Sequence, residues 1–291
     1  MVLINLINTT TMKKLLLKSI LPILFISIST AQADVDEKYL KVCADPYMLP
    51  FSNKDGEGYE NKIAELFAKK LDRELKYAFF PQRMGFIRNT LKAEDENGPG
   101  FKCDLVMSVP SNFELAAATD PYFTSTYVLV YAKGRKLDSI TDPSMLSAFV
   151  KEHGNIRFGL ADRGPAQIWV ANNKLLGSIA PYQAQPGNPK SNPGLEMIQD
   201  IVSDKIDAAI VWGPMAGYLA KKHKEEDGVE LVLLEVPDDP NFPEMRFHYS
   251  FSMAVRYGNK EWKETINKLI KENNKEITSI LESFGVPLVE K

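Results

Sequence analysis

The chain has few of the side chains that most often bind metals or carry catalysis. It contains two cysteines and three histidines among 291 residues. Cys43 and Cys103 cannot build a zinc site alone, and no histidine lies near either of them at ligand spacing. In an oxidising compartment the pair would form a structural disulfide, and the alternative is two buried thiols on neighbouring strands. Cys103 begins its predicted strand whereas Cys43 lies late in its own. This offset strains the Cα separation of about 4.4–6.8 Å that a disulfide needs, so both alternatives stay open.

The motifs of common enzyme classes are missing as well. The sequence contains no phosphate-binding P-loop, no G-x-G-x-x-G, no G-x-S-x-G and no H-E-x-x-H. His153, His223 and His248 have no Cys, Asp or Ser partner at a spacing that would indicate catalysis. We therefore predict no catalytic residues, no cofactor and no metal, and we expect a protein that is not an enzyme.

Long apolar runs are also rare, and the one that occurs lies near the start of the chain. Met12-Lys13-Lys14 precedes an apolar run from residue 15 to residue 28, which ends in Ala31-Gln32-Ala33. A charged start, an apolar centre and a small-x-small exit are typical of a secretory signal peptide. A membrane anchor would need roughly 18 or more apolar residues. We expect residues 1–33 to be cleaved, Asp34 to begin the mature protein, and the protein to act in the periplasm.

The charge balance argues against nucleic acid and membranes as partners. Three of the 35 basic residues lie in the predicted signal peptide, which leaves 32 basic against 38 acidic residues and a formal charge of −6. A net negative chain is repelled by phosphate backbones and by anionic lipid surfaces.

The rest of the sequence alternates short apolar strands with amphipathic helices. This rhythm predicts an α/β fold with mostly parallel sheets and helices on both faces. The strands are expected at residues 40–44, 74–80, 104–109, 127–131, 155–160, 206–211, 229–236 and 250–256. Helices are expected to begin near residues 59 and 165 and to cover residues 194–202, 214–222, 260–271 and 275–283.

Two long strands suggest how the chain is divided. The strands near residues 127–132 and 229–236 bracket an α/β unit that could fold by itself. A chain that enters a second lobe and returns needs two crossing segments, and these strands could supply them as a hinge. We predict one lobe from residues 38–129 and 237–291 and a second lobe from residues 130–236.

A ligand or partner is expected beyond the carboxyl ends of the parallel strands. The loops that follow these strands are rich in aromatic and polar side chains. The candidate binding residues are Tyr47, Phe51, Asn53, Gln82, Arg83, Phe86, Asn112, Arg163, Gln167 and Trp212. Arg83 and Arg163 follow strands directly, where a guanidinium could clamp a carboxylate or form an ordinary ion pair.

Several long strings of the sequence carry a resemblance to known proteins. They are Val42-Cys-Ala-Asp-Pro, Leu49-Pro-Phe-Ser-Asn, Gly56-Glu-Gly-Tyr-Glu-Asn-Lys-Ile-Ala, Pro81-Gln-Arg-Met-Gly-Phe-Ile-Arg-Asn-Thr-Leu and Asp104-Leu-Val-Met-Ser-Val-Pro. At the level of the superfamily, the sequence looks like the type II periplasmic solute-binding proteins, which are two-lobed. More narrowly it resembles the MxaJ/XoxJ proteins, solute-binding-like accessory proteins of PQQ-dependent methanol dehydrogenases.

The departures from the amino-acid-binding members concern the two charges that grip a zwitterion. Those members carry an arginine after the third strand and an acidic residue in the second lobe. Here the matching positions hold Asn112 and Trp212. Losing charge-assisted contacts forfeits roughly 1.5–3 kcal/mol for each hydrogen bond. Trp212 instead offers a broad apolar surface of the kind that anchors protein interfaces, or packs against Pro214 and the hinge.

Three functions follow from the residues and the resemblance. The first is an accessory protein that binds a PQQ-dependent methanol dehydrogenase and assists its activation or assembly during methanol oxidation. The second is a transporter's receptor for a small metabolite of growth on one-carbon compounds, with that molecule in the cleft. The third is a hydrolase or dehydratase on the same fold. The missing clamp favours the first over the second.

Overall fold

The computed structural model describes residues 35–154 and 156–290. The predicted signal peptide and its cleavage site lie outside these residues, so they remain predictions. Within the described part of the chain, no helix is long and apolar enough to cross a membrane.

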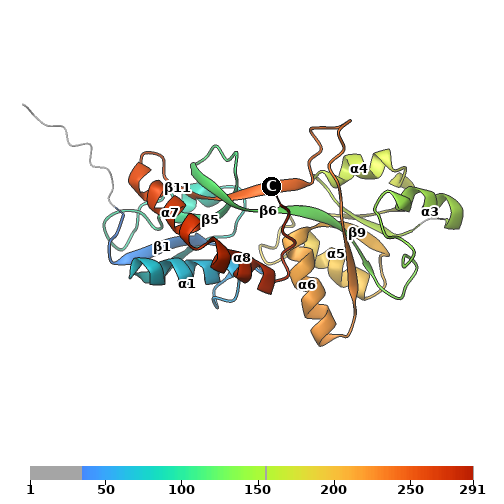
Figure 1. The fold of residues 1–291 in the computed structure, drawn as a ribbon, viewed down its shortest axis with the longest axis horizontal. Coiled ribbons are helices and arrows are strands. Elements are labelled where there is room, and N and C mark those ends of the chain that lie inside the picture. Colours follow the sequence, from blue (N-terminus) through green and yellow to red (C-terminus); the bar gives the residue numbers. More distant parts are fainter. Residues whose placement is uncertain (1–34, 155, 291) are drawn as a thin grey trace, which may run out of the picture. The chain divides into compact units, whose positions relative to one another are not determined.

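Strands and helices alternate along most of the chain (Figure 1). The strands are β1 (Tyr39–Ala44), β2 (Tyr47–Met48), β3 (Ser52–Asn53), β4 (Glu74–Phe79), β5 (Leu105–Pro110), β6 (Ala117–Ala132), β7 (Phe158–Ala161), β8 (Ile179–Tyr182), β9 (Ala208–Trp212), β10 (Leu231–Glu235) and β11 (His248–Val255). The helices are α1 (Tyr59–Leu71), α2 (Phe86–Asn89), α3 (Met145–His153), α4 (Ala166–Asn172), the 3-10 turn η1 (Leu176–Ser178), α5 (Pro193–Val202), α6 (Gly213–Glu226), α7 (Lys260–Glu272) and α8 (Asn274–Ser283).

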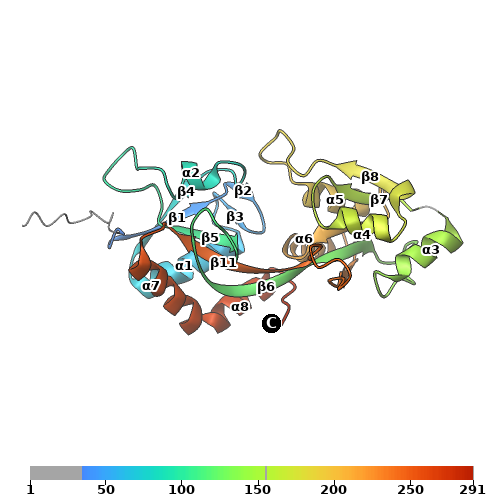
Figure 2. The same ribbon diagram turned by 90° about the horizontal axis from the view of Figure 1, so that it is seen from above.

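One lobe is built on a sheet in which β4, β1 and β5 are parallel and β11 and β6 are antiparallel neighbours. Helices cover both faces of this sheet, and its strands therefore carry apolar residues on both faces. Leu40, Val42 and Met107 pack against helices α1, α7 and α8 on one face, whereas Val106 and Ala254 pack against α2 on the other. Figure 2 shows these helices on opposite sides of the sheet.

The second lobe repeats this plan with other strands. Strands β8, β7 and β9 are parallel, and the second half of β6 joins them as an antiparallel neighbour together with β10. Helices α3 and α4 cover one face around Phe158 and Trp169. Helices α5 and α6 cover the other face around Ile198 and Ala216. Two separate hydrophobic cores therefore flank each sheet.

Strand β6 belongs to both lobes and joins the two sheets into one hydrogen-bonded path. Its first half pairs with β11, and its second half pairs with β9 and β10. After β10 the chain runs through residues 236–247, where Met245 and Phe247 are buried in the second-lobe core, and then crosses in β11. The exact division of the chain into lobes remains a prediction.

The segment after α8 adds a third connection between the lobes. Gly285 meets Gly217 of α6 so closely that a Cβ on Gly217 would lie 1.8 Å from the Gly285 carbonyl oxygen. Two residues further on, Ser125 of β6 donates a hydrogen bond to the Pro287 carbonyl at 2.6 Å. Only glycine allows this approach of backbone to backbone, so the pair sets the path of the C-terminal segment.

The two cysteines form a disulfide, with a Cα–Cα separation of 5.4 Å. Cys43 faces Val106 in the register of β1 and β5. Cys103 is not held to that register, because it precedes β5 in a bent segment whose next residue, Asp104, donates a backbone hydrogen bond to Lys41 at 2.8 Å. The offset that the sequence indicated is therefore no obstacle, since the bend brings Cys103 back to β1.

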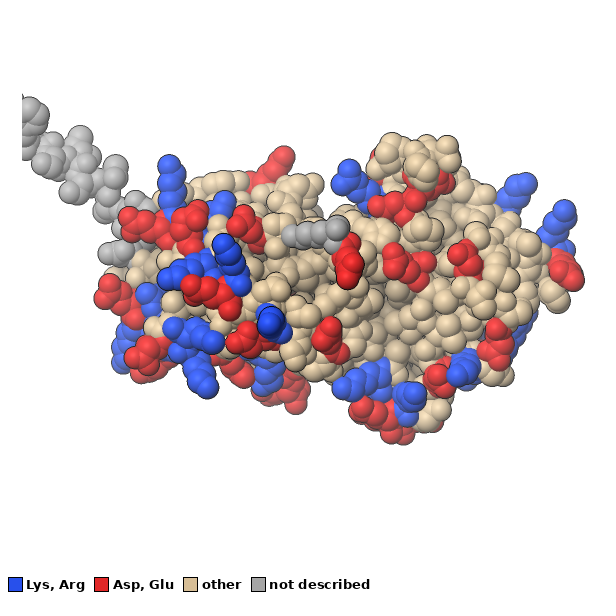
Figure 3. Space-filling view, viewed as in Figure 1, with Lys and Arg blue, Asp and Glu red and all other residues tan. Residues whose placement is uncertain are grey.

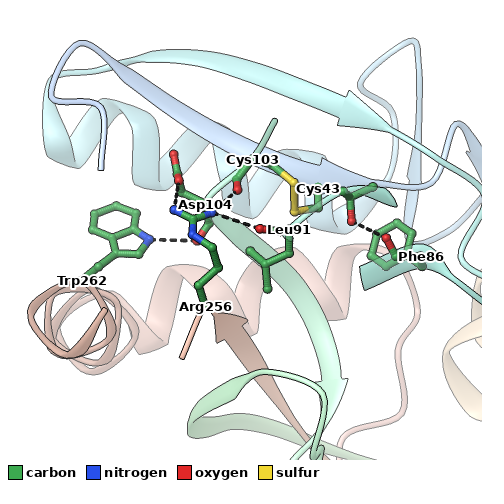
Figure 4. The surroundings of a disulfide bond; sticks show 8 residues. Cys43, Phe86, Leu91, Cys103, Asp104, Arg256 and Trp262 are labelled. Atoms are coloured by element: carbon green, nitrogen blue, oxygen red, sulfur yellow. Dashed lines mark hydrogen bonds and ion pairs between the residues drawn. A yellow bond between two sulfur atoms is a disulfide. The ribbon is translucent and has the colours of Figure 1, made fainter. Parts of the chain in front are cut away.

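The disulfide lies beside a buried ion pair (Figure 4). Arg256, 7% exposed, donates to the carboxylate of Asp104 and to the carbonyl oxygens of Cys103 at 2.6 Å and Leu91 at 3.2 Å. The indole nitrogen of Trp262 donates to the Asp104 carbonyl at 3.0 Å. Burial raises the pKa of the Asp104 carboxyl, although Arg256 acts in the opposite direction.

Candidate functional site

A cavity of about 320 Å³ lies where the two lobes meet. It forms beyond the carboxyl ends of β7 and β9, which is where open parallel sheets bind ligands. The first lobe contributes Met48 and Phe51 from the loop after β1, and Tyr127 comes from β6. The second lobe supplies the remaining lining residues, which are Ala161, Arg163, Gly164, Pro165, Ala166, Ala184, Asn192, Pro193, Gly194, Met197, Ile210, Val211, Trp212 and Met215.

Trp212 forms one wall of this cavity and is also packed against the hinge. It ends β9 directly before the first turn of α6, and its ring contacts Tyr127 at 5.1 Å, Phe251 at 5.4 Å and Tyr249 at 6.0 Å between centroids. The sequence left packing and ligand contact as alternatives, and the structure shows that the residue packs on the hinge while it lines the cavity. Such support holds the indole in one orientation.

Arg163 is the cationic residue of the lining. It is exposed, and its backbone has φ +69°, a conformation that few residues other than glycine adopt. Within residues 35–154 and 156–290, no hydrogen bond or ion pair engages its guanidinium. Arg163 can therefore meet an incoming carboxylate or carbonyl group.

Arg83 is used differently from Arg163. Its guanidinium reaches across from the first lobe and donates to the carbonyl oxygens of Pro186 at 2.5 Å and Asn188 at 2.6 Å, with Ser191 at 3.5 Å. All three belong to the second-lobe segment that leads into α5. In this conformation Arg83 therefore ties the lobes together, and an incoming group must compete with backbone carbonyls for it.

Three other predicted residues hold the loops in place. Asn53 is buried, and its side chain donates to Glu57 at 2.7 Å and accepts from the Glu57 amide at 2.9 Å. Gln82 donates from its side chain to the Ser108 carbonyl at 3.4 Å. Tyr47 is 43% exposed, with Lys190 of the second lobe 5.0 Å from its ring centroid. Tyr47 and Asn53 line an adjoining cavity of about 480 Å³.

The expectation that Phe86 faces the cleft is wrong. Gly85, at φ +91°, turns the chain into α2, and Phe86 is then 6% exposed in the core next to the disulfide. Asn112, in the turn after β5, and Gln167, on α4, are exposed but do not line the cavity. The structure thus brings Phe51, Arg163 and Trp212 together and separates the others from them.

Sequence reasoning missed the methionines. Met48, Met197 and Met215 line the cavity, and Met84 beside Arg83 is 91% exposed. Unbranched thioether side chains adapt their shape to different apolar surfaces. The signal available in the sequence was the place of Met48 and Met215 a few residues beyond the ends of β1 and β9, close to Tyr47 and Trp212.

A buried acid lies beneath the first-lobe loops. Glu60, in the first turn of α1, is 4% exposed, and its Oε1 has no hydrogen-bond partner among the residues that the structure describes. Burial raises the pKa of Glu60 to about 7, while Ser108 lowers it and Asp45 raises it further. Ser108 also shares a 2.8 Å hydrogen bond with Tyr122. This carboxyl is neutral over much of the acidic range.

Two histidines have carboxylate partners that the sequence spacing did not indicate. His223 contacts Asp227 at 2.5 Å on α6, and His248 lies between Glu235 and Asp238. Neither contact includes a serine or cysteine, so neither forms a nucleophile with its base.

No family model matches the chain. Among solved structures, the chain is similar to the periplasmic binding protein XoxJ from Methylobacterium extorquens AM1. The two are 30% identical, the match covers 87% of this chain and 100% of XoxJ, and the TM-score is 0.67. The chain belongs to the MxaJ/XoxJ family of type II solute-binding-like proteins.

Two further proteins support the assignment to the MxaJ/XoxJ family. MxaJ from Methlophaga aminisulfidivorans MPT is 25% identical with a TM-score of 0.66, and the match covers 86% of this chain and all of MxaJ. Protein MoxJ from Methylorubrum extorquens is 23% identical over 268 residues, which are 88% of this chain and 84% of MoxJ. The prediction of a two-lobed type II periplasmic binding protein fold is confirmed. Similarity to a periplasmic binding protein agrees with an exported protein.

Proposed function

We propose that this member of the MxaJ/XoxJ family is a periplasmic accessory protein. It binds a PQQ-dependent methanol dehydrogenase through its cleft-facing loops and assists the activation or assembly of that enzyme during methanol oxidation. The observation that carries the proposal is the lining of the cavity between the lobes. The lining is mostly apolar and includes three aromatic and three methionine side chains, and it contains Arg163 but no Asp or Glu.

A lining of this kind suits a protein surface better than a zwitterionic solute. A free amino acid has an ammonium group that must leave water, and burying a charge without a partner is costly. An apolar side chain of a partner protein has no such group. Methionine and aromatic residues are enriched at protein interfaces, and Trp212 and Phe51 present these surfaces from opposite lobes.

Exposed apolar side chains extend the surface beyond the cavity. Met84 at 91% and Tyr47 at 43% exposed lie in the segments that follow β4 and β1 of the first lobe, and Ile168 at 40% lies on α4 of the second. A specific interface buries roughly 1,200–2,000 Å² in total, more than the cavity alone can offer. On the face shown in Figure 3, acidic and basic side chains are intermixed over the first lobe, without a continuous basic area.

The test is the affinity of the purified mature protein for purified methanol dehydrogenase, measured by surface plasmon resonance or calorimetry. We expect Trp212→Ala to weaken the complex by about 2 kcal/mol, since a supported indole in the cleft would be a central anchor. Tyr257→Ala is the matched control, because Tyr257 is 60% exposed on the first lobe and does not line the cavity. It should bind like the wild type.

A Trp212→Ala, Arg83→Ala double variant separates the cleft from the rest of the surface. If it binds the dehydrogenase as well as the wild type, the cleft takes no part in the complex. If no complex forms with the wild type, the proposal fails, and a receptor for a small solute becomes the better-supported function. The 320 Å³ cavity favours that second candidate, since small-molecule sites begin at about 300 Å³.

A further inference from the structure

The imidazole of His248 lies between two carboxylates. Its Nε2 is 2.6 Å from Oε1 of Glu235, the last residue of β10, and its Nδ1 is 3.2 Å from Oδ1 of Asp238. A neutral imidazole carries one N–H, so it can donate to one carboxylate while its other nitrogen presents a lone pair to the second. Only the protonated ring donates to both. The arrangement therefore favours imidazolium.

The surroundings of the ring act on its proton affinity in both directions. Partial burial disfavours the charged form, but the contacts with Glu235 and Asp238 outweigh it, and the pKa of His248 is raised above its ordinary value. Asp238 has a lowered pKa despite partial burial, because the Phe247 amide and His248 donate to it. His248 is 23% exposed, so the carboxylates are not fully screened from it by water.

The remaining ionisable groups of the neighbouring segments do not contact the ring. Arg246, two residues before it, is exposed, and Tyr249 follows it with a pKa raised by burial and by Asp238. On β6, which faces the ring's own strand, Tyr127 is the nearby ionisable residue, and burial raises its pKa to about 12. Asp239 and Glu244 lie in the same link. Between about pH 6 and pH 9, the phenols of Tyr127 and Tyr249 do not change charge.

The position of this group in the fold gives it a mechanical consequence. Phe247 is buried in a core of the second lobe, whereas Phe251 packs against a core of the first. The three residues between them therefore cross from one lobe to the other. At the same level β6 makes its own crossing, and Tyr127 is hydrogen-bonded to Val236 at 3.1 Å and to Phe247 at 3.0 Å.

Asp238 ties the two ends of the link together at this crossing. Its Oδ1 accepts from the Phe247 amide at 2.5 Å and lies 3.4 Å from the His248 amide nitrogen. Glu235 fastens the ring from the end of β10. The His248 side chain thus joins the first residue of β11 to Glu235 and Asp238, which flank the start of the segment that anchors in the second lobe.

We propose that His248 is a proton-operated clamp on the hinge between the lobes. When the ring is protonated, it holds the start of β11 to Glu235 and Asp238 and restricts rotation of the lobes. When the ring loses its proton, one carboxylate contact is lost and the crossing strand becomes free to bend. The clamp concerns the hinge alone, so it stands or fails independently of the binding to methanol dehydrogenase.

The test uses the folded mature protein and NMR. A titration of the three histidines gives the pKa of His248, and hydrogen exchange gives the protection of the Phe247 amide at pH 5.5 and pH 8.5, corrected for the intrinsic exchange rate. By linkage, the protection of the Phe247 amide should fall as the pH rises. The largest possible fall is set by the pKa shift of His248 and is about tenfold for each unit by which the folded state raises that pKa. Small-angle scattering should show a larger radius of gyration at pH 8.5.

All variants are measured in a Glu60→Gln background, because Glu60 has a pKa of about 7 and titrates in the same pH range. There His248→Gln should remove the pH dependence of both measurements, and Glu235→Gln should lower the His248 pKa while leaving the Asp238 contact in place. His223→Gln is the matched control, since it removes another histidine–carboxylate contact on α6, and it should behave like the wild type. The clamp is refuted if His248 titrates at or below its ordinary pKa. It is also refuted if Phe247 protection or the radius of gyration does not change with pH, or if either change persists in His248→Gln.

Discussion

Arg256 and Arg163 carry the same side chain in opposite surroundings. Arg256 is buried beside the disulfide, where its donors meet Asp104 and two backbone carbonyls and its guanidinium carbon lies 4.0 Å from the Phe101 ring centroid. Arg163 is exposed at the cavity, with no such engagement among the described residues. The first has its hydrogen-bonding capacity satisfied by the fold, whereas the second retains it for something that arrives. The comparison separates the part of the molecule that is built for rigidity from the part that is available for binding.

The largest expected effect is the loss of stability when Arg256 is replaced. Arg256→Leu leaves the buried carboxyl of Asp104 without its partner, and breaking a buried ion pair costs about 3–5 kcal/mol. Arg163→Leu should change the free energy of unfolding by less than about 0.5 kcal/mol, because an exposed side chain without contacts contributes little. Urea denaturation of both variants beside the wild type measures the difference. Equal losses would contradict the division between a structural and an available arginine.

The next effect concerns Glu60, an ionisable group that, unlike the exposed Arg163, is buried beneath the first-lobe loops. Its pKa is 4.5 in an ordinary setting and about 7 here. The fold therefore favours the neutral acid, and this contribution to stability is complete below pH 4.5 and is lost as the pH rises to about 7. The shift corresponds to a contribution on the order of 3 kcal/mol.

Glu60→Gln keeps a neutral side chain of the same size at this position. We expect it to be more stable than the wild type above pH 7 and to lack the decline in stability between pH 4.5 and pH 7. Glu65→Gln is the control, because Glu65 lies on the same helix but is exposed and paired with Lys62. Unfolding free energies measured from pH 4 to pH 8 decide the matter, and parallel curves for Glu60→Gln and the wild type would disprove the buried titration.

Periodicity and strand order predicted much of the fold, because these signals lie within short stretches of sequence. The helix beginning at Tyr59 and the buried strand at Leu105 follow from local apolar patterns. Strand β6 extends ten residues upstream of the predicted start at residue 127, since its first half gains stability from pairing with β11. Strand β8 was not expected, because its four residues carry no clear apolar period.

The candidate site was less predictable, because it depends on where each side chain points after the chain turns. Trp212 and Arg163 could be placed from the rule that sites form beyond strand ends. The same rule placed Phe86 in the cleft, but the turn at Gly85 directs it into the core. The contacts of Arg83 with residues 186–191 join positions more than a hundred residues apart, which no local pattern reports.

The smallest expected effect is the absence of a response to free amino acids. The cavity offers Arg163 for a carboxylate, but its lining holds no Asp or Glu to receive the ammonium group. A zwitterion that enters would keep one buried charge without a partner, and that cost cancels the gain at the other end. A ligand present at 100 times its Kd would raise the free energy of unfolding by about 2.7 kcal/mol. We therefore expect thermal unfolding in millimolar amino acids to match unfolding in buffer. Calorimetry that gave micromolar affinity for any zwitterionic amino acid would show that some other group supplies the second charge, and it would move Arg163 from a docking surface to a solute clamp.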